Sequence, residues 1–126
     1  MVDNPVAPLA NKRLLVVEDE YLIAADLAFK LERAGAEVVG PAGTVEDALD
    51  LLRAEGGRLD GALLDVNLSG ERVFPVADAL AQHGIPFIFA TGYDASIIPP
   101  AHAGVPRHEK PVDWSRLLRE LAARIA

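Results

Sequence analysis

Charged and hydroxyl side chains stand at the ends of several short apolar runs of the chain. The acidic pair Glu18 and Asp19 follows the first run, and Asp65 follows the third. Thr91 ends the fourth run, and Lys110 follows the segment that we expect to be the last strand. If these runs are parallel strands, their carboxyl ends meet at one edge of a sheet, where open α/β folds bind ligands. We therefore expect these five side chains to converge.

This set of side chains predicts metal-assisted phosphoryl transfer. Three carboxylates brought together repel one another, so they need a cation or else take raised pKa values. Oxygen ligands without cysteine or a neighbouring histidine favour Mg²⁺ over zinc. A metal, a lysine and a threonine hydroxyl together stabilise the oxygens of a transferring phosphoryl group. A carboxylate can be the acceptor, and Asp65, alone at the end of its run, is the candidate.

Each of these positions, taken alone, also fits a structural role. The run Glu18-Asp19-Glu20 would cap a helix and complement its dipole. Asp65 would form a turn, and Lys110, which precedes Pro111, would be a solvated loop lysine. The ordered arrival of the whole set at one sheet edge favours the functional interpretation.

Strands and helices must alternate along the chain to position these residues. Apolar runs without alternation are typical of strands buried on both faces of a parallel sheet. We expect strands at residues 14–17, 36–40, 62–64, 85–90 and 105–108. We expect helices within residues 23–34, 44–56, 73–83 and 114–125. This order predicts an α/β fold with a mainly parallel sheet.

One segment departs from the alternation. A helix is due between Tyr93 and Val105, but Ile97 and Ile98 run into Pro99-Pro100. Proline cannot donate to the helical ladder, and it disfavours the helical conformation of the residue before it. At most one turn is expected there. Ile97 and Ile98 would form an association surface if they stay uncovered.

Length and charge narrow the class of protein. The chain has 126 residues and a net charge of −7, from 12 Lys and Arg against 19 Asp and Glu. This length predicts one domain, which we assign to residues 13–126 after an N-terminal leader of residues 1–12. The negative surface disfavours nucleic acid. The uncharged run 79–93 is too short to span a membrane. The absence of cysteine agrees with a cytoplasmic protein, and we expect one without an effector domain.

From Arg13 to Ala126 the sequence resembles a bacterial response-regulator receiver domain. The matching motifs are the acidic pair after Leu-Val-Val, Asp65 in Leu-Leu-Asp-Val-Asn-Leu, Thr91 in Ala-Thr-Gly, and Lys110-Pro111. The resemblance implies a doubly wound five-stranded parallel sheet of flavodoxin-like type. The proline pair implies that its fourth helix is short or disordered.

The resemblance also assigns roles to the matching residues. Asp65 would accept a phosphoryl group from a histidine kinase, and Thr91 and Lys110 would contact the phosphoryl oxygens. The implied Mg²⁺ ligands are Asp19, Asp65 and the backbone carbonyl of Asn67, with Glu18 acting through water. Turnover would belong to the kinase, so such a chain is a phosphoacceptor domain and not an enzyme in the ordinary sense. In this family the Lys-Pro bond is usually cis.

The run Pro-Phe-Ile-Phe-Ala-Thr-Gly-Tyr at residues 86–93 resembles a receiver subgroup named FATGUY for its Phe-Ala-Thr-Gly motif. That subgroup is paired with kinases of the HWE or HisKA_2 type. Ser69 also fits it, because proline is usual at this position in the wider family. Arg107 departs from the wider family, which has Tyr or Phe there as a switch residue. We therefore expect phosphorylation to reorder residues 94–104 instead, through Thr91.

Other functions remain open at this stage. The leading hypothesis is a stand-alone phosphoacceptor that signals through a partner protein or serves in a phosphorelay. A receiver-like docking module that needs no phosphorylation is the alternative, which Arg107 keeps open. A haloacid-dehalogenase-type phosphatase would need a second Asp where this chain has Asn67. The three histidines lack the spacing of metal ligands, and we expect them on the surface; they are His83, His102 and His108.

Overall fold

The computed structural model describes residues 7–92 and 97–126. The β-strands are β1 (Arg13–Val17), β2 (Glu37–Ala42), β3 (Gly61–Asp65), β4 (Asn67–Leu68), β5 (Glu71–Arg72), β6 (Phe87–Thr91) and β7 (Arg107–Glu109). The α-helices are α1 (Tyr21–Arg33), α2 (Val45–Glu55), α3 (Phe74–Gln82) and α4 (Trp114–Ile125). Short 3₁₀ helices are η1 (Gly56–Arg58) and η3 (Pro100–His102).

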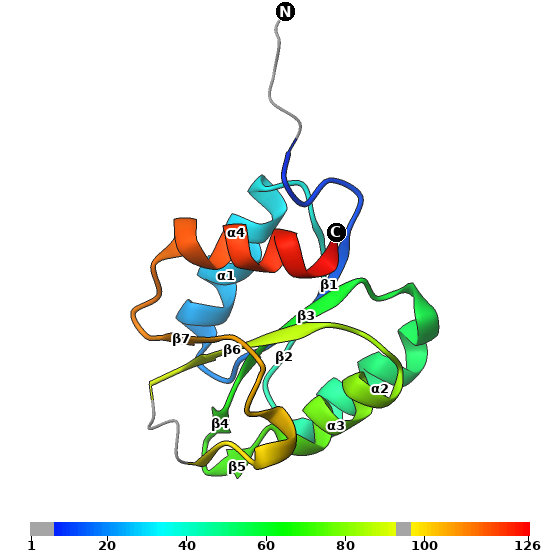
Figure 1. Ribbon diagram of the computed structural model, residues 1–126, viewed down its shortest axis with the longest axis vertical. Helices are drawn as coiled ribbons and strands as arrows, with labels where there is room; N and C mark the ends of the chain where they lie inside the picture. Colours follow the sequence, from blue (N-terminus) through cyan, green and yellow to red (C-terminus); the bar gives the residue numbers. More distant parts are fainter. Residues whose placement is uncertain (1–6, 93–96) are drawn as a thin grey trace, which may run out of the picture.

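Five of the described strands form one parallel sheet in the order β2-β1-β3-β6-β7 (Figure 1). The first crossover moves outward from β1 to β2, and the later strands add on the other side of β1. This is the flavodoxin-like order, and it reverses direction at the β1–β3 junction. The predicted α/β fold and its parallel sheet are confirmed.

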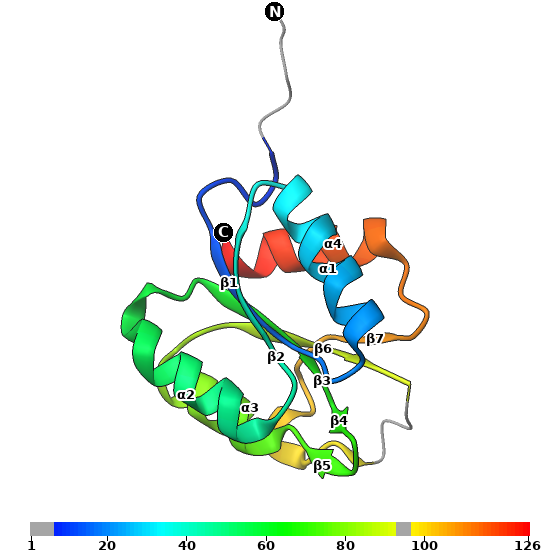
Figure 2. The same cartoon turned by 180° about the vertical axis from the view of Figure 1, so that it is seen from behind.

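Helices α1 and α4 cover one face of the sheet, and α2 and α3 cover the other (Figures 1 and 2). Successive side chains of a strand point to opposite faces. In β1, Leu15 and Val17 therefore enter the core beneath α2 and α3, whereas Leu14 and Val16 enter the core beneath α1 and α4. Burial on both faces explains why this run shows no alternation of polar and apolar residues.

The helix boundaries follow from side-chain caps and from one glycine. The hydroxyl of Thr44 accepts a hydrogen bond from the Asp47 N–H at 3.1 Å at the start of α2. Asp113 does the same for the Arg116 N–H at 3.2 Å at the start of α4. After α1 the chain turns at Gly35, which has φ +103 and is therefore favourable only for glycine.

The segment after β6 holds no α-helix among its described residues, 97–104, and η3 is its 3₁₀ turn. The expectation of at most one turn agrees with this part of the segment, and Tyr93 and Asp94 lie outside the described residues. Ile97 and Ile98 are half-buried and pack against the core beneath α2 and α3. The association surface was expected only if these two side chains stay uncovered, and the core covers part of both.

Residues 67–72 form a structure that the sequence patterns missed. β4 and β5 pair antiparallel, with Asn67 opposite Arg72 and Leu68 opposite Glu71. We call this pair the β4–β5 hairpin. It projects from the carboxyl end of β3 and lies beyond the main sheet (Figure 1).

The described part of the leader packs onto the domain. Leu9 is 0% exposed and belongs to the core beneath α1 and α4. Its N–H donates to the Ala34 carbonyl at 2.9 Å, just after α1 ends. Residues 1–6 of the leader lie outside the described part of the chain, and the boundary at residue 13 stays a proposal.

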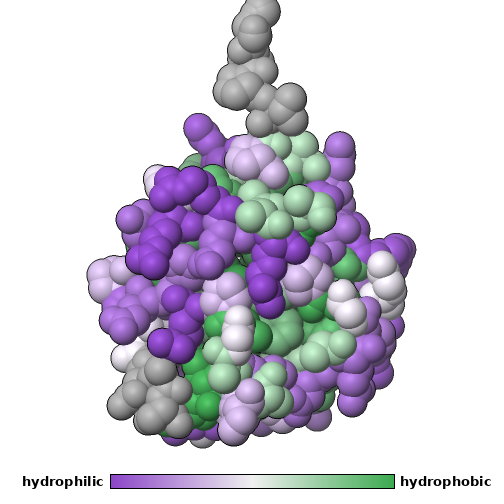
Figure 3. Space-filling model, in the orientation of Figure 1, coloured by the Kyte–Doolittle hydropathy of each residue, from purple (hydrophilic) through white to green (hydrophobic). Residues whose placement is uncertain are grey.

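β7 and α4 together cover the side of β6 that faces away from β3. Hydrophilic side chains gather over α4, and a hydrophobic strip lies below it, between the two helix layers (Figure 3). β7 pairs only with Phe89, Ala90 and Thr91 of β6. Arg124 of α4 donates its Nε–H to the carbonyl of Phe87 at 3.0 Å, at the start of β6.

No helix in the described part of the chain is long and apolar enough to cross a membrane.

Candidate functional site

The carboxyl ends of β1 and β3 bring three carboxylates together. Glu18 and Asp19 follow β1, Asp65 ends β3, and one oxygen from each lies within 4.8 Å of the others. We call these residues the acidic cluster. Glu18 and Asp65 are buried, and Asp19 is half-buried. The register explains the convergence, because Val17 pairs with Leu64 at the last rung between the two strands.

Lys110 follows β7 and brings a positive charge to the acidic cluster. Its Nζ lies 2.5 Å from Oε1 of Glu18 and 3.4 Å from Oδ2 of Asp65. The backbone N–H of Lys110 donates to the Thr91 carbonyl at 2.9 Å, which fixes the start of this loop against β6. The peptide bond between Lys110 and Pro111 is cis.

A cavity of about 230 Å³, which we call the site cavity, opens beside the acidic cluster. It is lined by Asp19, Glu20, Asp65, Asn67, Ser69, Gly92 and Lys110. The residues predicted at this edge thus meet there, with two qualifications. Thr91 is buried directly before the lining residue Gly92. Glu18 lies behind the cavity, where its second oxygen accepts the Glu20 N–H at 3.1 Å.

The pKa values of the site reflect how its charges are arranged. Burial, together with the negative charge of Glu18, raises the pKa of Asp65 to about 7. Burial opposes the ionisation of Asp19, but the hydrogen bonds to its carboxylate, of which that from the Ser69 hydroxyl is the strongest, together outweigh burial and lower the pKa of Asp19. For Lys110, burial disfavours the charge, but the hydrogen bond to Glu18 and the charge of Asp65 raise its pKa. Ionisation is therefore less favoured for Asp65 than for Asp19.

The donor atoms of the acidic cluster suit a hard divalent cation. They are all carboxylate oxygens, and their mutual distances allow one ion to contact all three. Burial, and after it the negative charge of Glu18, raises the pKa of Asp65 although the charge of Lys110 lowers it. A cation at this position would remove the repulsion, and the set fits Mg²⁺ better than zinc.

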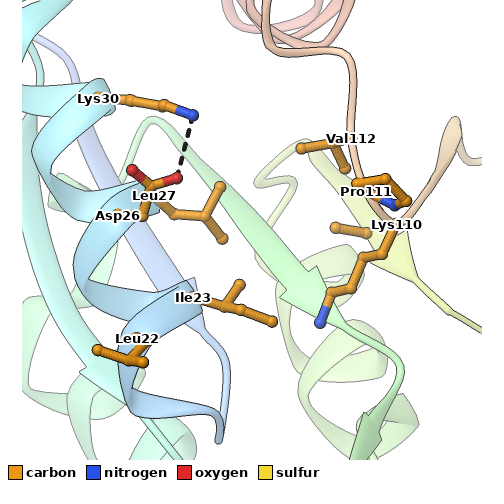
Figure 4. A pocket seen from close by; sticks show the side chains of 9 residues that line it. Leu22, Ile23, Asp26, Leu27, Lys30, Lys110, Pro111 and Val112 are labelled. Atoms are coloured by element: carbon orange, nitrogen blue, oxygen red, sulfur yellow. Dashed lines mark ion pairs between the residues drawn. The ribbon is translucent and has the colours of Figure 1, made fainter.

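A second cavity, of about 330 Å³, lies on the other side of Lys110. One wall is α1, and the other is the segment from Lys110 to Val112 (Figure 4). We call it the α1 groove. Its floor is largely apolar, and the ion pair between Asp26 and Lys30, at 3.0 Å, stands at one end. Lys110 lines both cavities and so joins the groove to the site.

Comparisons with known proteins agree with this geometry. No family model matches the chain. It is 38% identical to the sensory transduction protein LytT of Bacillus subtilis over 85 residues, 65% of this chain and 34% of LytT. The receiver domain of the hybrid histidine kinase CckA superposes with a TM-score of 0.75 at 26% identity, covering 90% of this chain and 99% of that one.

SdrG from Pseudomonas melonis Fr1, solved in its BeF₃-activated conformation, is 41% identical to this chain. The superposition covers 93% of this chain and 98% of SdrG, with a TM-score of 0.73. The chain belongs to the response-regulator receiver family. It spans about a third of the length of LytT, so the resemblance to that curated relative concerns one part of it.

Arg107 is the residue at which the family resemblance implies an aromatic switch side chain. Arg107 begins β7 and its side chain is exposed. The next residue, His108, is buried, and its Nε2 lies 2.5 Å from Oε1 of Glu120 on α4. The strand therefore turns the histidine inward and the arginine outward. This receiver domain therefore has an exposed arginine at position 107 and not an aromatic switch residue.

The expectation that the histidines lie on the surface was wrong for two of them. His108 is buried against α4, and His102 of η3 is buried within a group of aromatic rings. The His102 ring stacks on Phe74 and lies edge-to-face with Phe87, while its Nε2 lies 2.7 Å from Oδ1 of Asp78. The expectation holds for His83, which is exposed. The prediction failed because the two histidines contact residues distant in sequence, Asp78 and Glu120, and the spacing of histidines along the chain does not indicate such contacts.

Sequence reasoning also missed a residue of the site itself. Ser69 lines the site cavity, and its hydroxyl donates to Oδ2 of Asp19 at 2.5 Å. The pair is separated by 50 residues. The sequence signals at this position were the Ser69-Gly70 dipeptide, which is typical of a turn, and the fit of Ser69 to the receiver subgroup; neither indicated a contact with Asp19.

Proposed function

We propose that this receiver domain is a phosphoacceptor of a two-component system, and that Asp65 takes the phosphoryl group from a phosphohistidine of a histidine kinase. The observation that carries the proposal is the acidic cluster with Lys110 Nζ 3.4 Å from the Asp65 carboxylate. The existence of a BeF₃-activated form of SdrG supports it, because BeF₃⁻ is a tetrahedral analogue of a phosphoryl group. The proposal covers residues 13–126 as the receiver domain.

The proposed reaction is a displacement at phosphorus. An oxygen of ionised Asp65 bonds to phosphorus as the bond from phosphorus to the histidine nitrogen breaks, and that nitrogen keeps the electron pair. The ammonium of Lys110 lies close enough to Asp65 to stabilise negative charge on the oxygens of the transferring phosphoryl group. The hydroxyl of Thr91 would donate a hydrogen bond to a phosphoryl oxygen. Water later hydrolyses the aspartyl phosphate, so the domain carries the signal while the kinase turns over.

The residues that would hold Mg²⁺ are Asp19, Asp65 and the backbone carbonyl of Asn67, with Glu18 acting through water. Bound there, the ion neutralises charge on the acceptor and on the phosphoryl oxygens. Asn67 is held in place by its own contacts: its N–H donates to Oδ1 of Asp65 at 3.4 Å, and its side-chain oxygen accepts the Gly70 N–H at 3.0 Å. The β4–β5 hairpin would thus supply a backbone ligand beside the carboxylates of Asp19 and Asp65.

The kinase is proposed to dock along α1. Tyr21 and Leu22 are 81% and 80% exposed at the start of α1, next to the acidic pair. Leu22 also lines the α1 groove, which Lys110 joins to the site (Figure 4). A kinase surface carrying its phosphohistidine to Asp65 would bury both side chains. The resemblance to the FATGUY subgroup proposes an HWE or HisKA_2 kinase.

Output is proposed to run through the segment after β6 to a partner protein. Phosphorylation of Asp65 would act through Thr91 and reorder residues 94–104. Of these residues, 94–96 lie outside the described part of the chain. His102 anchors the described part to α3 through Asp78. Amide hydrogen exchange with and without BeF₃⁻ tests this: protection over residues 97–104 should change, and unchanged protection would contradict the proposal.

Phosphotransfer tests the central proposal. With Mg²⁺ and a small phosphodonor or a phosphorylated kinase, the protein should give an acid-stable, base-labile phosphoprotein. Asp65→Asn should abolish labelling, whereas Asp50→Asn should leave it unchanged, because Asp50 is exposed on α2. A folded protein that no donor labels would favour the docking module. Sustained phosphate release from many monoesters would favour a phosphatase.

A further inference from the structure

The β4–β5 hairpin is closed by a two-residue turn of unusual backbone conformation. Leu68 pairs with Glu71, so Ser69 and Gly70 are the turn residues. Their φ angles are +54 and +94. Two consecutive residues with positive φ are the signature of a type I′ turn, which matches the twist of a hairpin. The conformation at position 69 excludes proline, whose ring fixes φ near −65°.

The turn holds the Ser69 hydroxyl against the acidic cluster. Its Oγ lies 2.5 Å from Oδ2 of Asp19. The hairpin that carries it is fixed on both sides: the Gly70 N–H donates to the Asn67 side chain at 3.0 Å, and Oε1 of Glu71 accepts the Val45 N–H at 3.2 Å, at the start of α2. Ser69 is therefore presented by a braced element and not by a free loop.

The hydroxyl binds Oδ2 of the Asp19 carboxylate, which also interacts with the side chains of Glu18 and Asp65. Of the acidic cluster, Asp19 is the half-buried member, and Glu18 is already held by Lys110. Without a partner, the Asp19 side chain would sample several rotamers beside the site cavity. Hydrogen bonds that orient a ligating carboxylate commonly matter almost as much as the ligand itself.

We propose that Ser69 is a positioning residue, which holds the Asp19 carboxylate in the orientation that receives the divalent cation. The inference rests on the proposed function, since it requires the acidic cluster to bind Mg²⁺. It adds a residue of the β4–β5 hairpin to the site. It also gives a reason for serine at a position where a proline could not form this turn.

Two variants separate the hydroxyl from the turn. Ser69→Gly removes the hydroxyl and adopts positive φ without strain, whereas Ser69→Ala removes the same hydroxyl and strains the turn. Mg²⁺ affinity is measured by titration calorimetry and by amide chemical shifts, and the melting temperature is measured without Mg²⁺. We expect both variants to bind Mg²⁺ about tenfold more weakly. Only Ser69→Ala should melt at a lower temperature.

A double-mutant cycle adds a second readout. In an Asp19→Asn background, Ser69→Gly should cause no further loss of Mg²⁺ affinity, because its effect passes through Asp19. An equal loss in both backgrounds would overturn the inference. So would Ser69→Gly with the affinity of the unmodified protein, or a loss confined to Ser69→Ala, which would show that only the turn matters.

These failures are distinguishable from failure of the proposed function. If the unmodified protein binds Mg²⁺ and labels on Asp65 while Ser69→Gly binds equally well, only the role of Ser69 is wrong. If the folded, unmodified protein binds no Mg²⁺, the metal site and the role of Ser69 are both wrong.

Discussion

Strand β1 carries a charged cluster at each end, and the two clusters differ in how their charges are balanced. At its amino end, Arg13 binds Glu37 and Glu55, and its N–H donates to Oδ2 of Asp60 at 2.8 Å. A guanidinium can satisfy two carboxylates because it offers five donors in a planar fork. These acids are at least partly accessible to water, which further reduces their repulsion.

At its carboxyl end, β1 leads into the acidic cluster, where Lys110 faces three carboxylates in a more buried setting. Burial and the negative charge of Glu18 raise the pKa of Asp65 to about 7. One end of the strand thus serves the stability of the fold. The other end keeps carboxylates close together, and a bound cation would relieve their mutual repulsion. The next three predictions test this separation.

Leu9→Ala should have the largest effect, and only on stability. Leu9 is fully buried near the amino end of the sheet, so truncation should lower the free energy of unfolding by about 2–5 kcal/mol. Urea denaturation measures the loss. Leu22→Ala is the matched control, because Leu22 is 80% exposed and should change stability by less than about 0.5 kcal/mol. Equal stabilities of the two variants would place the leader outside the folded unit. A change in the Mg²⁺ affinity of Leu9→Ala would show that the two ends of β1 do not act separately.

Asp65→Asn should stabilise the metal-free protein above pH 7. The pKa of Asp65 is about 7 in the folded protein and near 3.8 when unfolded, so the folded state binds more protons between these values. Stability due to this group therefore falls as pH rises from about 4 to 7. At pH 8 the variant should be more stable by on the order of 2–4 kcal/mol, and the gain should shrink towards pH 4.

Urea denaturation in a chelator at pH 5 and pH 8 measures this gain. Asp50→Asn, on the exposed face of α2, should show no such pH dependence. Mg²⁺ should narrow the difference at pH 8, because it stabilises the unmodified protein by binding its folded state. If Asp65→Asn were less stable than the unmodified protein at pH 8, the acidic cluster would not be in conflict.

Arg13→Met should have the smallest effect of the three. It removes the ion pairs at the amino end of β1 and should lower the denaturation midpoint slightly, since partly exposed ion pairs contribute little. The loss should diminish at high salt and stay constant between pH 6 and 8. Mg²⁺ titration should give the affinity of the unmodified protein. A change in that affinity would show that the two ends of β1 are coupled.

The fold was predictable where its signal is local. Unbroken apolar runs identified the buried strands, and the helix expected within residues 114–125 is α4, which buries Leu117, Leu121 and Ile125. The members of the acidic cluster and Lys110 were predictable because parallel strands share one carboxyl edge. Their proposed roles still depend on the experiments above.

The missed features depend on contacts between distant parts of the chain. Strands of two residues, such as β4 and β5, are too short to show a period. Ser69 meets Asp19 only after β1 and β3 have paired, and His102 meets Asp78 only after η3 has packed on α3. The histidine spacing predicted surface positions, but hydrogen bonds and ring contacts with residues distant in sequence hold His102 and His108 in buried positions.

The hydrogen bond from Arg124 to the carbonyl of Phe87 bears on self-association of the protein at high concentration. The stretch of β6 that β7 leaves uncovered would otherwise offer a free acceptor to a strand of another molecule. A second copy approaching this edge meets a bulky cation instead. The last turn of α4 therefore helps to keep neighbouring sheets from joining into larger aggregates.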